Sequence, residues 1–267
     1  MNLTQNPASP VTEDPWVELR RFTAARIAVG RCGSSLPLAE SLAFRLDHAR
    51  ARDAVHSAFR REALAGELHA AGITCLQLES EVADRMEYLT RPDKGRRLSA
   101  RSRTVLAGQE KGCDLCLVVG DGLSARAMHE NAVPFVRTCL LMFARAGLKL
   151  GPVSLVANAR VAIADEVGRL LGVRVAVMAI GERPGLSSPN SMGVYMTLDP
   201  KPGTTDERRN CISNVRPGGL PVEEGARKLA WLVEEALRRN VSGVELKDRM
   251  TADYLPFGSD MPEIAAP

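Results

Sequence analysis

A buried strand that ends in a long loop is the feature that most constrains this fold. Val173–Ile180 is apolar and rich in β-branched residues, and it stops at Gly181-Glu182-Arg183-Pro184-Gly185. Such a run is typical of a strand that is covered on both faces. From Gly181 to Gly219 the chain is too rich in proline and glycine for a helix, and only Ser191–Leu198 predicts a further strand. Long ordered loops at strand ends commonly hold binding groups, so this passage is the candidate site.

The same alternation of strand and helix runs through the second half of the chain. Apolar runs at 115–119, 153–157 and 173–180 predict strands, and the stretches at 125–146 and 163–171 predict helices. Parallel strands need a crossover connection, which is usually a helix. The alternation therefore predicts an α/β fold, with a Rossmann-like, mostly parallel sheet and helices on both faces.

The first part of the chain is predicted to be mainly helical. Apolar residues at helical spacing predict a short amphipathic helix at 16–28, and a long helix over 38–70 with a break near Ser57. Ile73–Leu78 alternates like a first strand. The organisation that we expect is a flexible N-terminal tail at 1–15, a mainly helical region at 16–110, a Rossmann-like domain at 111–246 and a C-terminal tail at 247–267.

Three turns should meet at one edge of this sheet. Gly120–Ser124, Arg160-Val161 and Gly181–Gly185 each follow a predicted strand. The carboxyl ends of parallel strands share one edge, where glycines and helix N-termini let ligands approach the backbone. Gly120-Asp121-Gly122 lacks the third glycine of the dinucleotide fingerprint. A ligand-facing or helix-capping turn is therefore favoured over nicotinamide binding.

Composition excludes several classes of function. A chain of 267 residues with 45% hydrophobic and 25% charged residues is typical of a globular protein with a sizeable core. The formal net charge of +3 and the 4% aromatic content argue against sequence-specific nucleic-acid binding. No apolar run is long enough to span a membrane, and the order of a secretory signal is absent. A cytoplasmic protein with reduced thiols is expected.

Three groups of polar or reactive side chains each allow two interpretations. Cys113 and Cys116 form a single CxxC motif without a nearby histidine, which favours buried thiols over zinc or redox chemistry. His48 and His56 lie about two helical turns apart without a third ligand, which favours surface or packing roles. The basic turn at 91–97 could contact phosphate or an acidic partner, or could cap and remain solvated.

Six motifs of this chain, in the same order, resemble the small (light) subunit of bacterial ethanolamine ammonia-lyase. The resemblance covers Trp16 to Leu246, which is nearly the whole chain. Several independent motifs in the right order are far more specific than any one of them. The motifs are Ala25–Arg31, His48–Val55, Tyr88–Leu98, Gly120–Ser124, Gly181–Leu186 and Asn210–Asn214.

The resemblance implies an adenosylcobalamin-dependent enzyme that converts ethanolamine to acetaldehyde and ammonia by radical 1,2-amine migration and elimination. It also implies a hetero-oligomer in which a large subunit, a separate chain, holds the substrate and supplies the catalytic residues. The small subunit would help to bind and orient the cofactor and to exclude solvent. No catalytic residue and no metal ligand are then expected in this chain.

Three cobalamin-contact positions are implied by the resemblance. They fall on Val161, on Glu182 of the Gly-Glu-Arg-Pro-Gly motif, and on Cys211 of the Asn-Cys-Ile-Ser-Asn motif. A valine offers apolar surface, a carboxylate accepts from corrin amides or ribose hydroxyls, and a thiol packs as a small soft group. The alternatives are a core valine, a loop-capping carboxylate and an inert buried thiol. The mutase signature Asp-x-His-x-x-Gly is absent, so base-on binding is expected.

The alternative function is a non-catalytic, Rossmann-like ligand-binding or regulatory module. Such a module would bind its ligand alone, whereas a lyase subunit would be active only with its partner. A stand-alone nicotinamide oxidoreductase is disfavoured by the missing fingerprint. About fifteen residues precede Trp16, fewer than in the better-known members of the family, which argues against targeting to a bacterial microcompartment.

Overall fold

The sheet of this protein has six strands in the order β1-β3-β2-β4-β5-β6, in a computed structural model that describes residues 9–258. Neighbouring strands from β1 to β4 are parallel, and β5 and β6 extend the sheet as antiparallel strands. The predicted α/β fold with a mostly parallel sheet is confirmed. The strands are β1 (Cys75–Glu79), β2 (Leu115–Gly120), β3 (Val153–Ala157), β4 (Val175–Gly181), β5 (Met192–Leu198) and β6 (Arg209–Val215).

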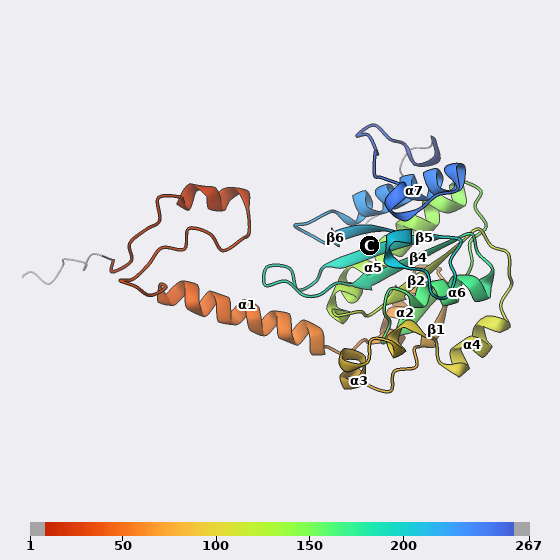
Figure 1. Ribbon diagram of the computed structural model, residues 1–267, viewed down its shortest axis with the longest axis horizontal. Coiled ribbons are helices and arrows are strands. Elements are labelled where there is room, and N and C mark those ends of the chain that lie inside the picture. The colour runs from red at the N-terminus through yellow and green to blue at the C-terminus, as the bar shows by residue number, and fades with distance from the viewer. Residues whose placement is uncertain (1–8, 259–267) are drawn as a thin grey trace, which may run out of the picture.

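Helices cover the sheet and lead into it, as Figure 1 shows. The predicted long helix of the first part is two helices, with the break between His56 and Arg61. The helix predicted at 163–171 has those bounds and ends at Gly172, which adopts the left-handed conformation with φ of 65°. The α-helices are α1 (Leu38–His56), α2 (Arg61–Ala70), α3 (Arg85–Thr90), α4 (Ala100–Ala107), α5 (Ala125–Arg145), α6 (Ile163–Leu171) and α7 (Val222–Arg239).

Alternate residues of the central strands enter two separate cores, because successive side chains of a strand point to opposite faces. In β2, Leu117 and Val119 pack in the core beneath α2, α5 and α7. Cys116 and Val118 pack in the core on the other face, beneath α4 and α6. Both faces are therefore buried at the centre of the sheet, and this explains why its strands are continuous apolar runs in the sequence.

The antiparallel strands differ from the centre because helices cover one of their faces only. Val194 and Met196 of β5 are buried in the core beneath α5 and α7. On the opposite face Tyr195 is half-buried at the edge of the second core, and Cys211 of β6 is exposed. We call this uncovered side of β5 and β6 the open face.

The segment before the sheet stands apart from the rest of the molecule. We call residues 9–56, which end with α1, the N-terminal arm; Figure 1 shows it extending away from the sheet. The prediction of an amphipathic helix at 16–28 is wrong. The structure has a shorter 3-10 helix at Val17–Phe22, and none of its residues is buried. The arm exposes large apolar side chains, among them Trp16 at 66% and Phe22 at 73%.

The described part of the C-terminal segment, 247–258, packs along α7. Arg227 of α7 donates through Nη1 to the carbonyl of Tyr254 at 2.8 Å, and the Tyr254 hydroxyl donates to Glu234 at 2.7 Å. The Phe257 ring lies edge-on to a core ring, Phe143, at 6.1 Å. Residues 1–8 and 259–267 of the two predicted tails lie outside the described residues.

Candidate functional site

The turns that follow β2, β3 and β4 are joined by hydrogen bonds at one edge of the sheet. Asp121 accepts from the backbone N–H of Ala159 at 3.0 Å, which joins the first two turns. The N–H of Leu123 donates to the carbonyl of Gly181 at 2.9 Å, which joins the first to the third. Ser124 caps α5 and also donates to the carbonyl of Pro189 at 2.7 Å. These contacts fix the loops around the candidate site.

Two glycines allow the first and third turns to approach this closely. A Cβ atom at Gly122 would lie 2.2 Å from the carbonyl oxygen of Gly181, and Gly122 has φ of +54°. A Cβ at Gly181 would lie 2.1 Å from the carbonyl oxygen of Ser124. Both distances are far below van der Waals contact, so a side chain at either position would force the turns apart. Gly122 and Gly181 therefore allow the backbones of the two turns to pack directly against each other.

A stack of three side chains holds the turn after β3. The guanidinium groups of Arg85 and Arg160 both lie over the Tyr88 ring, at 4.5 Å and 4.1 Å from its centroid. The Tyr88 hydroxyl donates to the carbonyl of Ala159 at 3.0 Å, and Arg85 donates to Asp121 at 3.1 Å. Burial raises the pKa of Asp121 to about 6, although the Ala159 amide and Arg85 both oppose this shift.

Val161 and Cys211 meet at a hollow of about 250 Å³ beside the open face. Val161 follows β3, and Cys211 lies in β6, so the fold unites residues that are far apart in the sequence. Tyr195 forms part of the same wall and is the register partner of Cys211 across β5 and β6. The Nε atom of Arg160, which also lines the hollow, is buried without a hydrogen-bond partner among the described residues.

Glu182 lies beyond Tyr195 and does not line that hollow. Its carboxylate accepts from the Ser191 hydroxyl and from the backbone N–H of Asn214 at 3.2 Å, and thus ties β4 to the ends of β5 and β6. Burial raises the pKa of Tyr195, and the neighbouring Cys211 and Glu182 raise it further. Tyr195 is therefore adjacent to two of the three predicted residues, Cys211 and Glu182. Sequence reasoning missed it, although it is the one aromatic residue in the strand at 192–198.

A larger hollow of about 700 Å³ adjoins the first. The two share four lining residues, Arg96, Ala162, Asp206 and Arg209. The basic turn at 91–97, predicted to bind phosphate or to remain capped and solvated, forms one side of this larger hollow with Asp93, Arg96 and Arg97.

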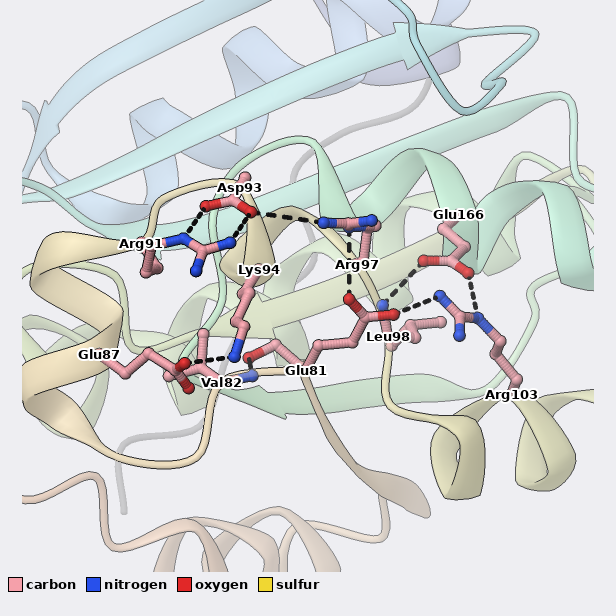
Figure 2. Close-up of polar contacts among 11 residues, drawn as sticks. Glu81, Val82, Glu87, Arg91, Asp93, Lys94, Arg97, Leu98, Arg103 and Glu166 are labelled. Atoms are coloured by element: carbon pink, nitrogen blue, oxygen red, sulfur yellow. Dashed lines mark hydrogen bonds and ion pairs between the residues drawn. The ribbon is translucent and has the colours of Figure 1, made fainter.

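Most cations of the basic turn are paired with acids, as Figure 2 shows. Arg91 donates to both oxygens of Asp93, and Arg97 lies 3.3 Å from Glu81. Lys94 pairs with Glu87 in the same way. These three cations are therefore paired with carboxylates of the chain itself, which favours a structural role for them over phosphate binding.

A buried ion pair lies behind both hollows. Arg209 donates to the two carboxylate oxygens of Asp165 at 2.6 and 2.7 Å, and the side chains are only 3% and 1% exposed. Arg209 also donates to Thr197 Oγ1 at 3.0 Å and to the Thr204 carbonyl at 2.6 Å. Burial raises the pKa of Asp165, and the bonds from Arg209 oppose that shift. The pair anchors β6 to α6 and β5.

Most of the chain matches a known protein family. A family model described as ethanolamine ammonia-lyase light chain matches residues 13–247. The chain belongs to this family. It is 53% identical over 244 residues to the ethanolamine ammonia-lyase small subunit of Azotobacter vinelandii, with 90% of each chain covered. It is 48% identical over 262 residues to that of Bradyrhizobium diazoefficiens, covering 97% of this chain and 99% of the relative.

Membership of the ethanolamine ammonia-lyase family makes this chain the small subunit of a carbon–nitrogen lyase. The two thiols of the CxxC motif, Cys113 and Cys116, are free and buried, and burial raises the pKa of Cys116 to about 12. His48 stacks against Phe44 at 6.3 Å on the surface of α1. Within residues 9–258 no cluster of three metal-ligating side chains occurs, and no helix is long and apolar enough to cross a membrane.

Proposed function

We propose that this small subunit acts in ethanolamine degradation and binds adenosylcobalamin, base-on, through Val161, Glu182 and Cys211. The reaction would be the conversion of ethanolamine to acetaldehyde and ammonia by radical 1,2-amine migration and elimination. When bound, the cofactor supplies the radical chemistry. The residues of this chain bind the cofactor, orient it and exclude water, and the large subunit holds the substrate.

The observation that supports this proposal is the meeting of Val161 and Cys211 at one hollow beside the open face. Val161 is half-buried at the edge of the second core and Cys211 is exposed, so both present surface to the hollow. An apolar side chain and a thiol beside an aromatic ring form a surface suited to the flat side of a large organic group.

The residues present also fit the polar parts of a cobalamin. Its corrin ring bears amide side chains that need acceptors, and its nucleotide tail bears a phosphodiester that needs a donor. Glu182 supplies carboxylate oxygens next to the open face, where it already holds the N–H of Asn214 at 3.2 Å. The buried Nε of Arg160 has no acceptor within residues 9–258, and Arg96 lines both hollows.

The large subunit of ethanolamine ammonia-lyase is the partner that we propose. The N-terminal arm supports this, because large apolar side chains such as Trp16 and Leu38 stay exposed along it in the isolated chain. Exposed apolar surface of this extent is typical of protein–protein interfaces. All six cysteines are free thiols, which supports a reducing, cytoplasmic location for the hetero-oligomer.

The first experiment is a deamination assay with the purified chain, a cognate large subunit and adenosylcobalamin. Activity is expected only in the complete mixture. A Cys211→Trp variant should weaken cobalamin binding by the assembled enzyme, measured by absorbance titration, because the indole would fill the hollow. Leu141→Trp, on α5 and away from the open face, is the matched control.

Two results would contradict this proposal. One is full deamination by the large subunit without this chain. The other is corrinoid binding by the small subunit alone with no effect on turnover, which would favour a regulatory module.

A further inference from the structure

We propose that Arg96 binds the phosphodiester in the nucleotide tail of the cobalamin, an inference that rests on the proposed function. The corrin side chains are neutral amides, whereas the phosphodiester carries one negative charge. A guanidinium group recognises a phosphate through two parallel hydrogen bonds. An arginine that binds the phosphodiester must line one of the two hollows and must not already be paired with a carboxylate.

The other arginines of the hollows already have partners. Arg97 pairs with Glu81 and Asp93, as Figure 2 shows. Arg103 donates to Glu166 at 2.6 Å and to Glu81 at 3.2 Å. Arg209 pairs with both Asp165 and Asp206. Arg160 donates through Nη2 to the carbonyl of Tyr88 at 2.8 Å, and its Nε is buried and out of reach of a ligand in the hollow.

Arg96 differs from these arginines because its side chain has no hydrogen bond or ion pair within residues 9–258. It is exposed and lines both hollows. A ligand that occupied either hollow would therefore meet a guanidinium that no carboxylate competes for.

The turn before Arg96 is built to place it beside Val161. A Cβ atom at Gly95 would lie 2.8 Å from Cγ of Arg160 and 3.2 Å from the carbonyl of Asn158. The Gly95 carbonyl accepts from the N–H of Arg160 at 2.8 Å. This contact clamps the basic turn onto the turn after β3. Arg96 directly follows Gly95, whose carbonyl holds Arg160, and Arg160 directly precedes Val161, the proposed contact to the corrin ring.

Charge and size agree with a singly charged, nucleotide-sized group in the larger hollow. Its lining has four arginines (Arg96, Arg97, Arg103 and Arg209) and three carboxylates (Asp93, Glu166 and Asp206), which leaves an excess of one positive charge. The volume of about 700 Å³ is in the range of small-molecule and cofactor sites. The ring would lie over the smaller hollow, and the tail would pass Arg96 into the larger one.

The test compares two corrinoids on the assembled enzyme, with and without the Arg96 guanidinium. Cyanocobalamin has the nucleotide tail, and dicyanocobinamide lacks its phosphate, ribose and base. Arg96→Gln should weaken the binding of cyanocobalamin by about tenfold or more, since a hydrogen bond to a charged group is lost. Dicyanocobinamide should bind the variant and the wild type within about twofold, measured by absorbance titration.

Arg101→Gln is the matched control, because this arginine is exposed on α4 and lines neither hollow. It should leave the ratio of the two dissociation constants unchanged, and Arg96→Lys should restore part of the cyanocobalamin affinity. Far-UV circular dichroism and co-elution with the large subunit verify that each variant folds and assembles.

Two outcomes would overturn the assignment of Arg96. They are an equal loss of affinity for both corrinoids, and no loss for either. If the wild-type enzyme binds neither corrinoid, the proposed cofactor role fails first, so the two failures can be told apart.

Discussion

Large apolar side chains are buried beneath the sheet but exposed on the N-terminal arm. Phe135 of α5 is fully buried beneath the sheet, whereas Phe22 of the arm is 73% exposed. The side-chain ion pairs of the arm, such as Arg20 with Glu40 at 2.8 Å, lie near its surface, and such pairs contribute little to stability. The sheet is therefore stabilised by its own packing, and the apolar residues of the arm are available to a partner.

The largest effect should come from matched substitutions in the two regions. Phe135→Ala should lower the free energy of unfolding by about 4 kcal/mol, because it opens a cavity in the core. Phe22→Ala should change it by less than about 0.5 kcal/mol, as is usual for exposed positions. Urea denaturation of both variants measures the difference, and similar values would contradict the comparison.

The buried ion pair sharpens the same contrast for charged residues. Arg209→Met should cost about 3 kcal/mol of stability, because it leaves the Asp165 carboxylate buried without a counter-charge. Arg238→Met, which removes an exposed arginine that pairs with half-buried Glu235, should cost under about 1 kcal/mol. Thermal unfolding gives both values. A double variant that also carries Asp165→Leu should recover part of the loss, and its failure to do so would point to lost packing.

A smaller effect is expected from pH, through Asp121 in the turn that follows β2. Its folded-state pKa of about 6 lies above the ordinary value near 3.9, so the folded state binds the proton more tightly. The stability from this proton is fully present below about pH 4 and is lost as the pH rises through about 6. The wild type should lose about 1 kcal/mol relative to Asp121→Asn between about pH 5 and about pH 7. Urea denaturation at both pH values tests this, and parallel curves would contradict it.

The smallest change in stability, with the largest change in assembly, is expected in the arm. A Leu38→Ser, Leu42→Ser variant should keep its free energy of unfolding within about 0.5 kcal/mol, because both side chains are exposed. Its affinity for the large subunit, measured by sedimentation, should fall about tenfold or more. Met86→Ser, exposed on α3 outside the arm, is the control. Unchanged assembly of the double variant would assign the arm another role.

The sequence predicted those elements whose residues are apolar throughout or regular in period. β3 and α6 have the predicted bounds, and β2 and β4 differ by one or two residues at their ends. β6 was missed because its exposed side is polar and because Asn210 is buried, donating to the carbonyls of Gly243 and Leu246. Apolar spacing in that strand therefore does not report burial.

Three helices, α3, α4 and α7, were also missed, and the last two had a signal in the sequence. α7 has Leu229, Leu232, Val233 and Ala236 at helical spacing, and all are buried. α4 follows Ser99, whose hydroxyl accepts from the N–H of Ser102 as an N-cap. The glycines and prolines that mark the surrounding loops hid both patterns.

The sequence predicted which turns form the candidate site, but it did not predict which side chains pair with one another there. The turns after the strands had to share an edge, since parallel strands end together. Arg96 and Arg97 are adjacent and identical in type, so their sequence cannot tell which one meets an acid. Only the three-dimensional structure shows Arg97 beside Glu81, and it gives the Arg96 side chain no partner within the described residues 9–258. The role of Tyr195 likewise depends on its register with Cys211.

The break between α1 and α2 makes the arm a lever. A helix of 19 residues is about 28 Å long, so a rotation of about 10° at its base moves the far end by about 5 Å. At that base Arg85 Nε donates to the carbonyl of Val55 at 2.9 Å, and the same guanidinium contacts Asp121 and the Tyr88 ring. The converse also holds: a partner that binds the far end of the arm would apply a torque at its base, where Arg85 holds Val55, Asp121 and Tyr88.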